Sequence, residues 1–268
     1  MRSRVFVGIF VVTALSVAAL GQQFVEPVER FPLTKAANNI EGWFEVLADS
    51  RITPELKKKM WGKGDWETVL DAKDPLRESF TKDAPDDVLF RITMKNGYVA
   101  KTEPLDRPIC VVKPEQWPGG GVIYFITVDY SADAGEGATL STRLLEIHGA
   151  RFEWLEAREP STAPEDEDTA PADKKSKQAK DKEEKSRRSH DPTKPIRLSK
   201  SQNADWKIAD AGNFRDILQV FTRPSSLDQS MIVYVRYHFD GKNWMRTEKE
   251  EPGDWDSKQA FPSATKFP

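Results

Sequence analysis

Apolar and polar residues alternate with a period of two from residue 88 onward, which predicts β-strands rather than helices. The first such strand should place one apolar side toward the core, made of Val88, Phe90, Ile92 and Met94. Asn96-Gly97 follows it, and this pair is preferred in the two-residue type I′ turn of a β-hairpin. Residues 119–130 then predict another strand, rich in β-branched and aromatic residues, after a glycine break.

A second hairpin is predicted to turn at Gly149-Ala150, because a type II′ turn places glycine first. Its register gives four expected cross-strand pairs: Ile147 with Phe152, Leu145 with Trp154, Arg143 with Glu156, and Glu146 with Glu153. The apolar pairs and the pair of opposite charge support this register. The two glutamates would repel each other unless solvent separates them.

Two further strands are predicted at 214–224 and 229–239, although 214–221 alone would also fit a helix. A turn at Asp240-Gly241 would pair Tyr237 with Trp244. The side expected to face the core carries Met231, Val233, Val235, Tyr237 and Phe239, and Trp244 joins it. The opposite side carries Tyr234, Arg236 and His238.

Several short helices are predicted between Pro32 and Phe80. Apolar residues at i, i+3, i+4 and i+7 predict one helix in 38–50, with Ile40, Trp43, Phe44 and Leu47 on its buried face. Thr53 before Pro54 has the pattern of an N-cap followed by proline in the first helical position. Asp65 and Asp74 are expected to cap two more helices.

Residues Glu159 to Pro195 contain no Val, Ile, Leu, Met, Phe, Trp or Tyr. Such a segment cannot bury enough apolar surface to offset the entropy of ordering, so we predict a disordered charged tether. The expected fold class is α+β, with short N-terminal helices packed on antiparallel β-meanders and this long disordered insertion. The expected organisation is 22–158 as helices plus strands, 159–195 as tether and 196–268 as a late meander that completes the same body.

The first 21 residues have the layout of a secretory signal peptide. Arg2 and Arg4 precede an apolar run from Val5 to Leu20, and small residues follow. The run is shorter than the roughly 20 apolar residues of a membrane span. We therefore expect an exported protein, periplasmic or extracellular, with no membrane span after cleavage of the signal.

Charge and motifs exclude several chemistries. The 268 residues carry 40 basic and 43 acidic side chains, so nucleic acid is not an expected partner. The single cysteine, Cys110, excludes an intrachain disulfide and is expected to be a small buried residue. The chain has no nucleophile elbow, P-loop, zincin motif or dinucleotide fingerprint, and its histidines lack metal-ligand spacing. We therefore expect no cofactor, no metal and no catalytic residue.

The expected function is non-catalytic binding or assembly in the cell envelope, with an envelope protein or a glycan as partner. Candidate binding residues are Tyr234, Arg236 and His238 on the late hairpin, together with Trp117 and Trp255, whose Pro, Gly and Asp neighbours suggest exposure. The alternative is a hydrolase that uses two carboxylates on polysaccharide or peptidoglycan, because acidic and aromatic residues are abundant. A cleft with two facing carboxylates would favour that alternative.

Overall fold

The computed structural model of the chain describes residues 26–63, 65–119, 121–131, 139–159, 193–211, 214–224 and 229–268. The predicted signal peptide and residues 160–192 of the predicted tether lie outside this part of the chain. Within it the fold is mostly antiparallel β-sheet with a few short helices, which supports the β-rich part of the predicted fold class.

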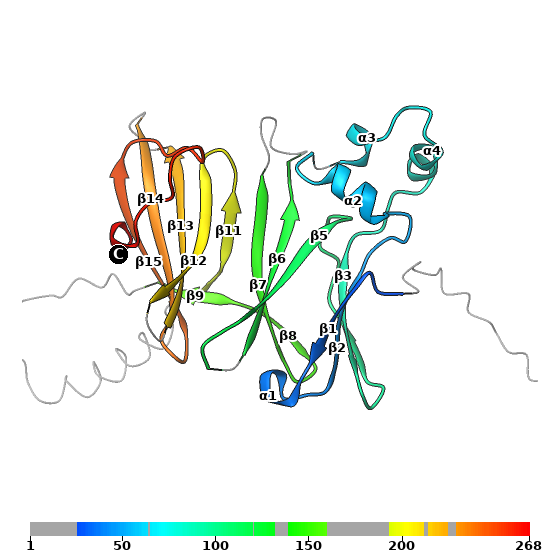
Figure 1. Cartoon of the computed structure of the whole chain (residues 1–268), viewed down its shortest axis with the longest axis horizontal. Coiled ribbons are helices and arrows are strands. Elements are labelled where there is room, and N and C mark those ends of the chain that lie inside the picture. Colours follow the sequence, from blue (N-terminus) through cyan, green and yellow to red (C-terminus); the bar gives the residue numbers. More distant parts are fainter. Residues whose placement is uncertain are drawn as a thin grey trace, which may run out of the picture.

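The strands form three sheets (Figure 1). Sheet A has the strand order β1-β2-β3-β4, from Glu29–Leu33, Gly42–Leu47, Leu89–Met94 and Val99–Lys101. Sheet B has the order β11-β7-β6-β5, from Arg197–Lys200, Leu140–His148, Val122–Asp129 and Cys110–Gln116, and β8 (Arg151–Trp154) pairs with β7. Sheet C has the order β10-β9-β15-β14-β13-β12, from Thr193–Pro195, Glu156–Arg158, Trp244–Pro252, Ser230–Phe239, Phe214–Pro224 and Ala204–Ala211.

The sheets stack as three layers, with sheet B in the middle (Figure 1). One core lies between sheets A and B, where Phe44 and Phe90 pack with Tyr124. A second core lies between sheets B and C, where Phe125 packs in one cluster with Val235. Successive side chains of a strand point to opposite faces, so the nearly continuous apolar run of β6 fills both cores. This is why 119–130 is rich in β-branched and aromatic residues.

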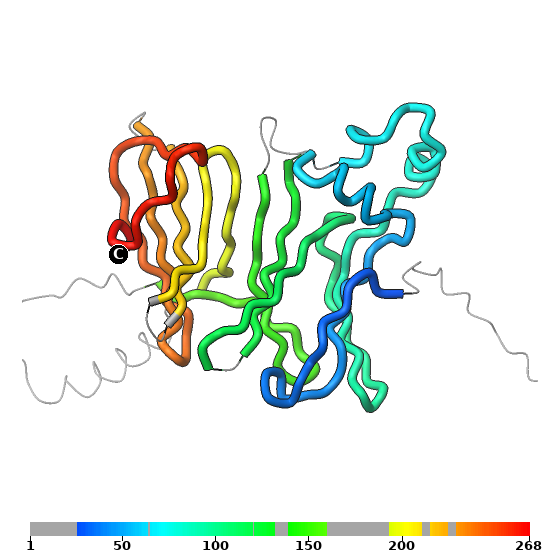
Figure 2. Tube along the Cα trace, viewed as in Figure 1, coloured from blue at the N-terminus to red at the C-terminus, as the bar shows by residue number. Residues whose placement is uncertain are grey.

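Strands from before and after residues 160–192 share sheets. β9 leaves sheet B after β8 and pairs in parallel with β15, while β11 pairs with β7 in sheet B before the chain enters β12. The green-to-red course of the chain in Figure 2 shows this passage from the central to the left-hand sheet. The predicted tether is shorter than expected at its end, because Thr193–Pro195 forms β10 and pairs with β9.

The short helices begin where the caps predict. Thr53 and Asp74 each accept a backbone N–H at the start of α2 (Pro54–Met60) and α4 (Pro75–Lys82), and Asp65 does the same for α3 (Trp66–Val69). The single turn α1 spans Lys35–Asn38. No helix in the described ranges is long and apolar enough to cross a membrane.

The predicted helix in 38–50 is wrong, because 42–47 forms the strand β2. Phe44 and Val46 alternate into the A–B core, while Trp43 points outward and is 43% exposed. The four apolar residues fit a helical face, but Phe44 and Val46 also fit a strand, and pairing with β1 and β3 decides between the two.

The hairpin registers differ in how well the turn residues predict them. At Gly149 (φ +59°) the predicted pairs of Leu145, Glu146 and Ile147 all form. The fourth pair is wrong, because the chain enters β9 after Trp154 and Arg143 lies opposite Arg197 instead.

The other two turns are longer than predicted. Met94 and Tyr98 bond across three residues, with Gly97 in the left-handed region, so the turn is not the two-residue type I′. Phe239 pairs with Trp244 across a four-residue loop, so Tyr237 lies opposite Arg246 rather than Trp244. A shift of two residues keeps each side chain on its face, and Val233, Val235, Tyr237 and Trp244 are buried as predicted.

Candidate functional site

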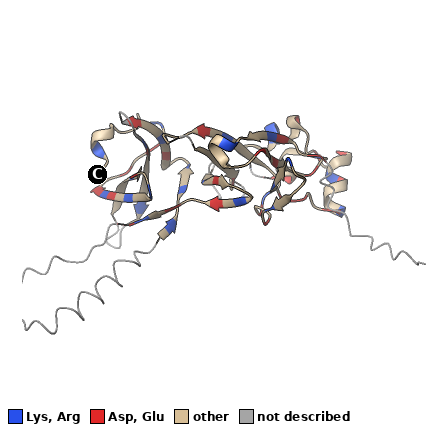
Figure 3. Ribbon diagram, turned by 90° about the horizontal axis from the view of Figure 1, so that it is seen from below, with Lys and Arg blue, Asp and Glu red and all other residues tan. Residues whose placement is uncertain are grey.

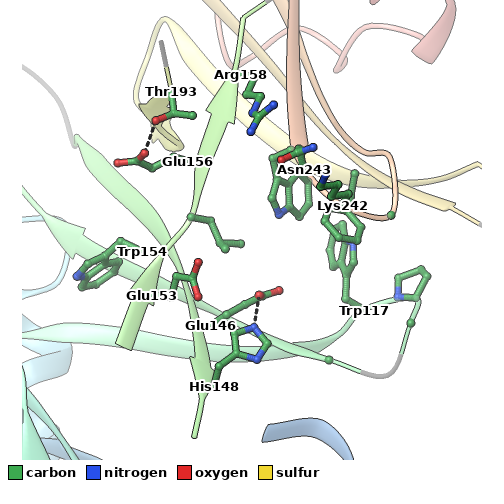
Figure 4. Close-up of a pocket in the computed structure, with 17 residues that line it drawn as sticks. Trp117, Glu146, His148, Glu153, Trp154, Glu156, Arg158, Thr193, Lys242 and Asn243 are labelled. Atoms are coloured by element: carbon green, nitrogen blue, oxygen red, sulfur yellow. Dashed lines mark hydrogen bonds and ion pairs between the residues drawn. The ribbon is translucent and has the colours of Figure 1, made fainter. Parts of the chain in front are cut away.

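A cavity of about 750 Å³ opens at the edge of the B–C core (Figure 4). Three turns surround it: the β7–β8 hairpin, the β14–β15 loop at 240–243 and the β5–β6 loop at 117–121. Its volume lies in the range of about 300–1,000 Å³ that is usual for ligand pockets. We call it the inter-sheet pocket.

One wall of this pocket is acidic and comes from the β7–β8 hairpin. Leu144 points into the B–C core, so alternation places Glu146 and His148 on the same face, beyond the apolar core. Glu153 lies directly opposite Glu146. The Glu146 carboxylate and His148 Nε2 are 2.9 Å apart, which orients both side chains (Figure 4).

The facing wall carries basic and amide groups, and Glu156 of β9 also lines it. Lys242 and Asn243 come from the β14–β15 loop, and Arg158 comes from the end of β9. The Asp240 carboxylate accepts the backbone N–H groups of Lys242 (2.8 Å) and Asn243 (2.7 Å), and these bonds hold the pKa of Asp240 below its usual value. This Asx turn explains why the loop has four residues and where its tip lies.

The floor is aromatic. The Trp117 and Trp244 rings lie 5.3 Å apart, and Phe239 packs on Trp244 at 5.5 Å. Both tryptophans are almost fully buried and belong to the B–C core. Such packing fixes the floor rigidly, so a ligand would meet a preformed apolar surface between two charged walls.

The structure distributes the predicted binding residues over two places. Trp117 lines the pocket, but it is 5% exposed, so the expectation that it is exposed is wrong. Trp255 is likewise buried, at 4%, in a cluster on the outer face of sheet C. Its indole packs there because the C-terminal segment lies along that face (Figure 2).

Tyr234, Arg236 and His238 share that outer face, as their alternation predicts. Tyr234 packs at 5.5 Å from the ring of Phe267, and Arg236 donates to the carbonyls of Ala264 and Phe267. His238 Nδ1 lies 2.7 Å from Asp216 on β13. The chain itself therefore engages this face, and a binding role for the three residues stays a prediction.

Sequence reasoning missed Glu146, Glu153, Lys242 and Asn243 as pocket residues. One signal was present, because two glutamates opposite each other are unfavourable unless solvent or a ligand separates them. In the structure this pair faces the pocket and not a core.

Within the described ranges, no three His, Cys, Asp or Glu side chains are grouped to hold a metal ion. Neither the family models, nor the curated proteins, nor the solved structures contain a match to this chain. The chemistry of the pocket is therefore the basis for inferring the function.

Proposed function

We propose that the protein is exported to the cell envelope and acts there as a non-catalytic binding protein whose ligand occupies the inter-sheet pocket. The observation that carries this proposal is the pairing of an acidic wall with a basic and amide wall over an aromatic floor. Among the described residues no ion pair joins the two walls, so the charges of Glu153 and Lys242 can face a ligand, while Glu146 is paired with His148. A peptide or an amino-substituted glycan of the envelope has the matching chemistry.

The expected contacts follow from this division of charge. A cationic group of the ligand lies between Glu146 and Glu153, an anionic or carbonyl group accepts from Lys242 and Asn243, and an apolar part rests on Trp117. Surface charge elsewhere is mixed, with acidic and basic segments interspersed along the body (Figure 3). The selectivity of such a protein would then come from the pocket rather than from a general charge field.

Titration of intrinsic tryptophan fluorescence tests the proposal, since Trp117 and Trp244 form the floor. The full chain is titrated with short envelope-derived peptides and with amino-sugar oligosaccharides. For a ligand that binds, Glu153→Gln and Lys242→Ala each weaken Kd about tenfold or more, because each removes a charged hydrogen-bond partner. Glu103→Gln, an exposed change outside the pocket, leaves Kd unchanged. Equal losses in all three variants would contradict a pocket-specific site.

Export itself is supported by the N-terminal pattern and is tested by the mass of the mature protein. The expected product lacks about the first 20 residues and is recovered outside the cytoplasm. An intact N-terminus in the cytoplasmic fraction would refute this part of the proposal.

The two-carboxylate hydrolase remains the alternative, and one observation favours it. Glu146 and Glu153 are direct cross-strand neighbours in one pocket, and such neighbours have Cβ atoms about 5 Å apart. Retaining glycosidases need their two carboxyl groups, rather than the Cβ atoms, about 5–5.5 Å apart, a separation that two glutamates at such positions can reach. Incubation with polysaccharide or peptidoglycan tests this alternative. If the protein produced new reducing ends and Glu153→Gln did not, hydrolysis would replace binding as the proposed function.

A further inference from the structure

Sheet A carries an ordered pattern of side chains on its outer face. The residues Pro32, Trp43, Thr93 and Val99 lie opposite one another across all four strands. The next row, two residues along each strand, consists of Arg30, Glu45, Arg91 and Lys101. We call the first the apolar row, after Pro32, Trp43 and Val99, and the second the basic row, after its two arginines and one lysine; the two rows lie about 7 Å apart.

The apolar row is accessible. Trp43 is 43% exposed and Val99 is 46% exposed, whereas Trp117, Trp244 and Trp255 are buried. A groove of about 550 Å³ runs along the Pro32, Trp43 and Thr93 part of this row, and its lining also includes Lys35, Glu41 and Lys95. Sheet A is one of the two outer layers, and α2, α3 and α4 gather at one end of it (Figure 1).

The basic row is held in position by a buried carboxylate. Glu45 is fully buried and accepts Arg30 Nε at 2.8 Å and Arg91 Nε at 2.5 Å. Each guanidinium has five donors in a fixed plane, so these bonds orient the groups and leave donors for an external acceptor. Arg30 also lies 5.7 Å from the Trp43 ring, which ties the two rows together.

Charge on this face is opposite to that of the whole chain. The face and its groove carry Arg30, Lys35, Arg91, Lys95 and Lys101 against Glu41 and Glu45, an excess of three positive charges. The chain as a whole has a net charge of −3. Charge complementarity therefore points to an anionic partner at this face.

We propose that the outer face of sheet A binds an anionic polysaccharide. One sugar ring stacks its C–H face on Trp43 while its carboxylate or sulfate group accepts from the basic row, and the two rows are spaced for this. A polysaccharide engages this face through its side chains, whereas a peptide strand could add only at the edge strands β1 and β4. This site is separate from the inter-sheet pocket.

Affinity electrophoresis of the full chain through gels that contain polygalacturonate, or neutral dextran as control, tests the proposal. We expect retardation by polygalacturonate alone, weakened by added salt. Trp43→Ala and Lys101→Ala each weaken binding about tenfold. Trp43→Phe keeps most of the binding, which guards against a Trp43→Ala variant that fails to fold. Glu153→Gln in the pocket leaves it unchanged, so this site and the proposed function can fail separately.

Lys113→Ala is the matched control, because it makes the same change in net charge on an exposed residue of β5. If Lys113→Ala and Lys101→Ala weakened the binding equally, net charge alone would explain the binding, and the proposal would be overturned. Retardation by dextran, unchanged binding in Trp43→Ala, or equally tight binding of single-stranded DNA would overturn it too. So would a concentration-dependent dimer that Trp43→Ala dissociates, since this face would then be an interface between copies.

Discussion

Replacing Glu45 by glutamine should destabilise the protein strongly at neutral pH and much less in acid. The carboxylate is fully buried and accepts from Arg30, Arg91 and Thr93 at 2.5 to 2.8 Å. Glutamine has the same shape, but one of its two terminal atoms is a donor that would face a guanidinium.

The size of the effect follows from the partners. A hydrogen bond to a charged group contributes about 1.5–3 kcal/mol, and breaking a buried ion pair costs about 3–5 kcal/mol. Here the Arg30 side chain is 52% exposed, so water can solvate it after the change, and Arg91 is the more costly partner at 20%. We expect Glu45→Gln to lose about 2–3 kcal/mol at pH 7, which lowers Tm by about 4–12 °C in a chain of this length.

The pH dependence distinguishes the loss of a stabilising buried charge from a simple packing effect. Burial raises the pKa of Glu45, but hydrogen bonds from Arg91, Thr93 and Arg30 outweigh it and hold the pKa below its ordinary value. A lowered pKa in the folded state stabilises the fold above the unfolded value of about 4.3, and this stability is lost as pH falls through the folded value. The difference between wild type and Glu45→Gln should therefore shrink below about pH 4.

Urea unfolding followed by tryptophan fluorescence at pH 7 and at pH 3 measures this difference. Asp49, whose pKa is also lowered despite its burial, titrates equally in both proteins and cancels. Glu103→Gln serves as the exposed control and should change stability by less than about 0.5 kcal/mol. A loss in Glu45→Gln that is the same at both pH values would refute an ionised, stabilising carboxylate.

Three further experiments test other parts of the structure. Burial raises the pKa of Cys110 to about 12, so iodoacetamide should label it only after unfolding, and rapid labelling of the native protein would contradict its place in the core. Gly42→Ala should cost about 1–3 kcal/mol or more in urea unfolding, because a Cβ would lie 2.3 Å from the Thr93 carbonyl oxygen; wild-type stability would show that β2 and β3 are not paired there. Limited proteolysis within 174–188 should leave the two parts together on a sizing column, since the B–C core joins both, and their separation would contradict a single body.

Turn chemistry decided which parts of the fold could be predicted. Gly149 has the positive φ that a type II′ turn needs, and the register around it is correct through Leu145 and Trp154. Asp240-Gly241 fits an equally familiar two-residue turn, yet the Asp240 carboxylate captures two later N–H groups and lengthens the loop. A side chain that bonds to the backbone can thus override the dipeptide preference.

The helix predicted at 38–50 failed for a different reason. Its four apolar residues satisfy a period of 3.6, while Phe44 and Val46 satisfy a period of two, and local spacing cannot separate these for a short run. The residue that separates them is Glu45, which would be solvated on the outer side of a helix. In β2 it is instead neutralised by arginines from the two neighbouring strands, and that pairing depends on residues 15 and 46 positions away.

The inter-sheet pocket could not be predicted because no single segment contains it. Its acidic wall belongs to sheet B, its basic wall to sheet C, and the two meet only because β9 leaves the first sheet for the second. Each hairpin alone shows an exposed polar end, which is what any solvated turn shows. A like-charge pair such as Glu146 and Glu153 is the exception, because two like charges directly opposite each other destabilise a sheet. When a predicted register places two like charges opposite each other, the pair can therefore indicate a ligand site, and the register need not be wrong.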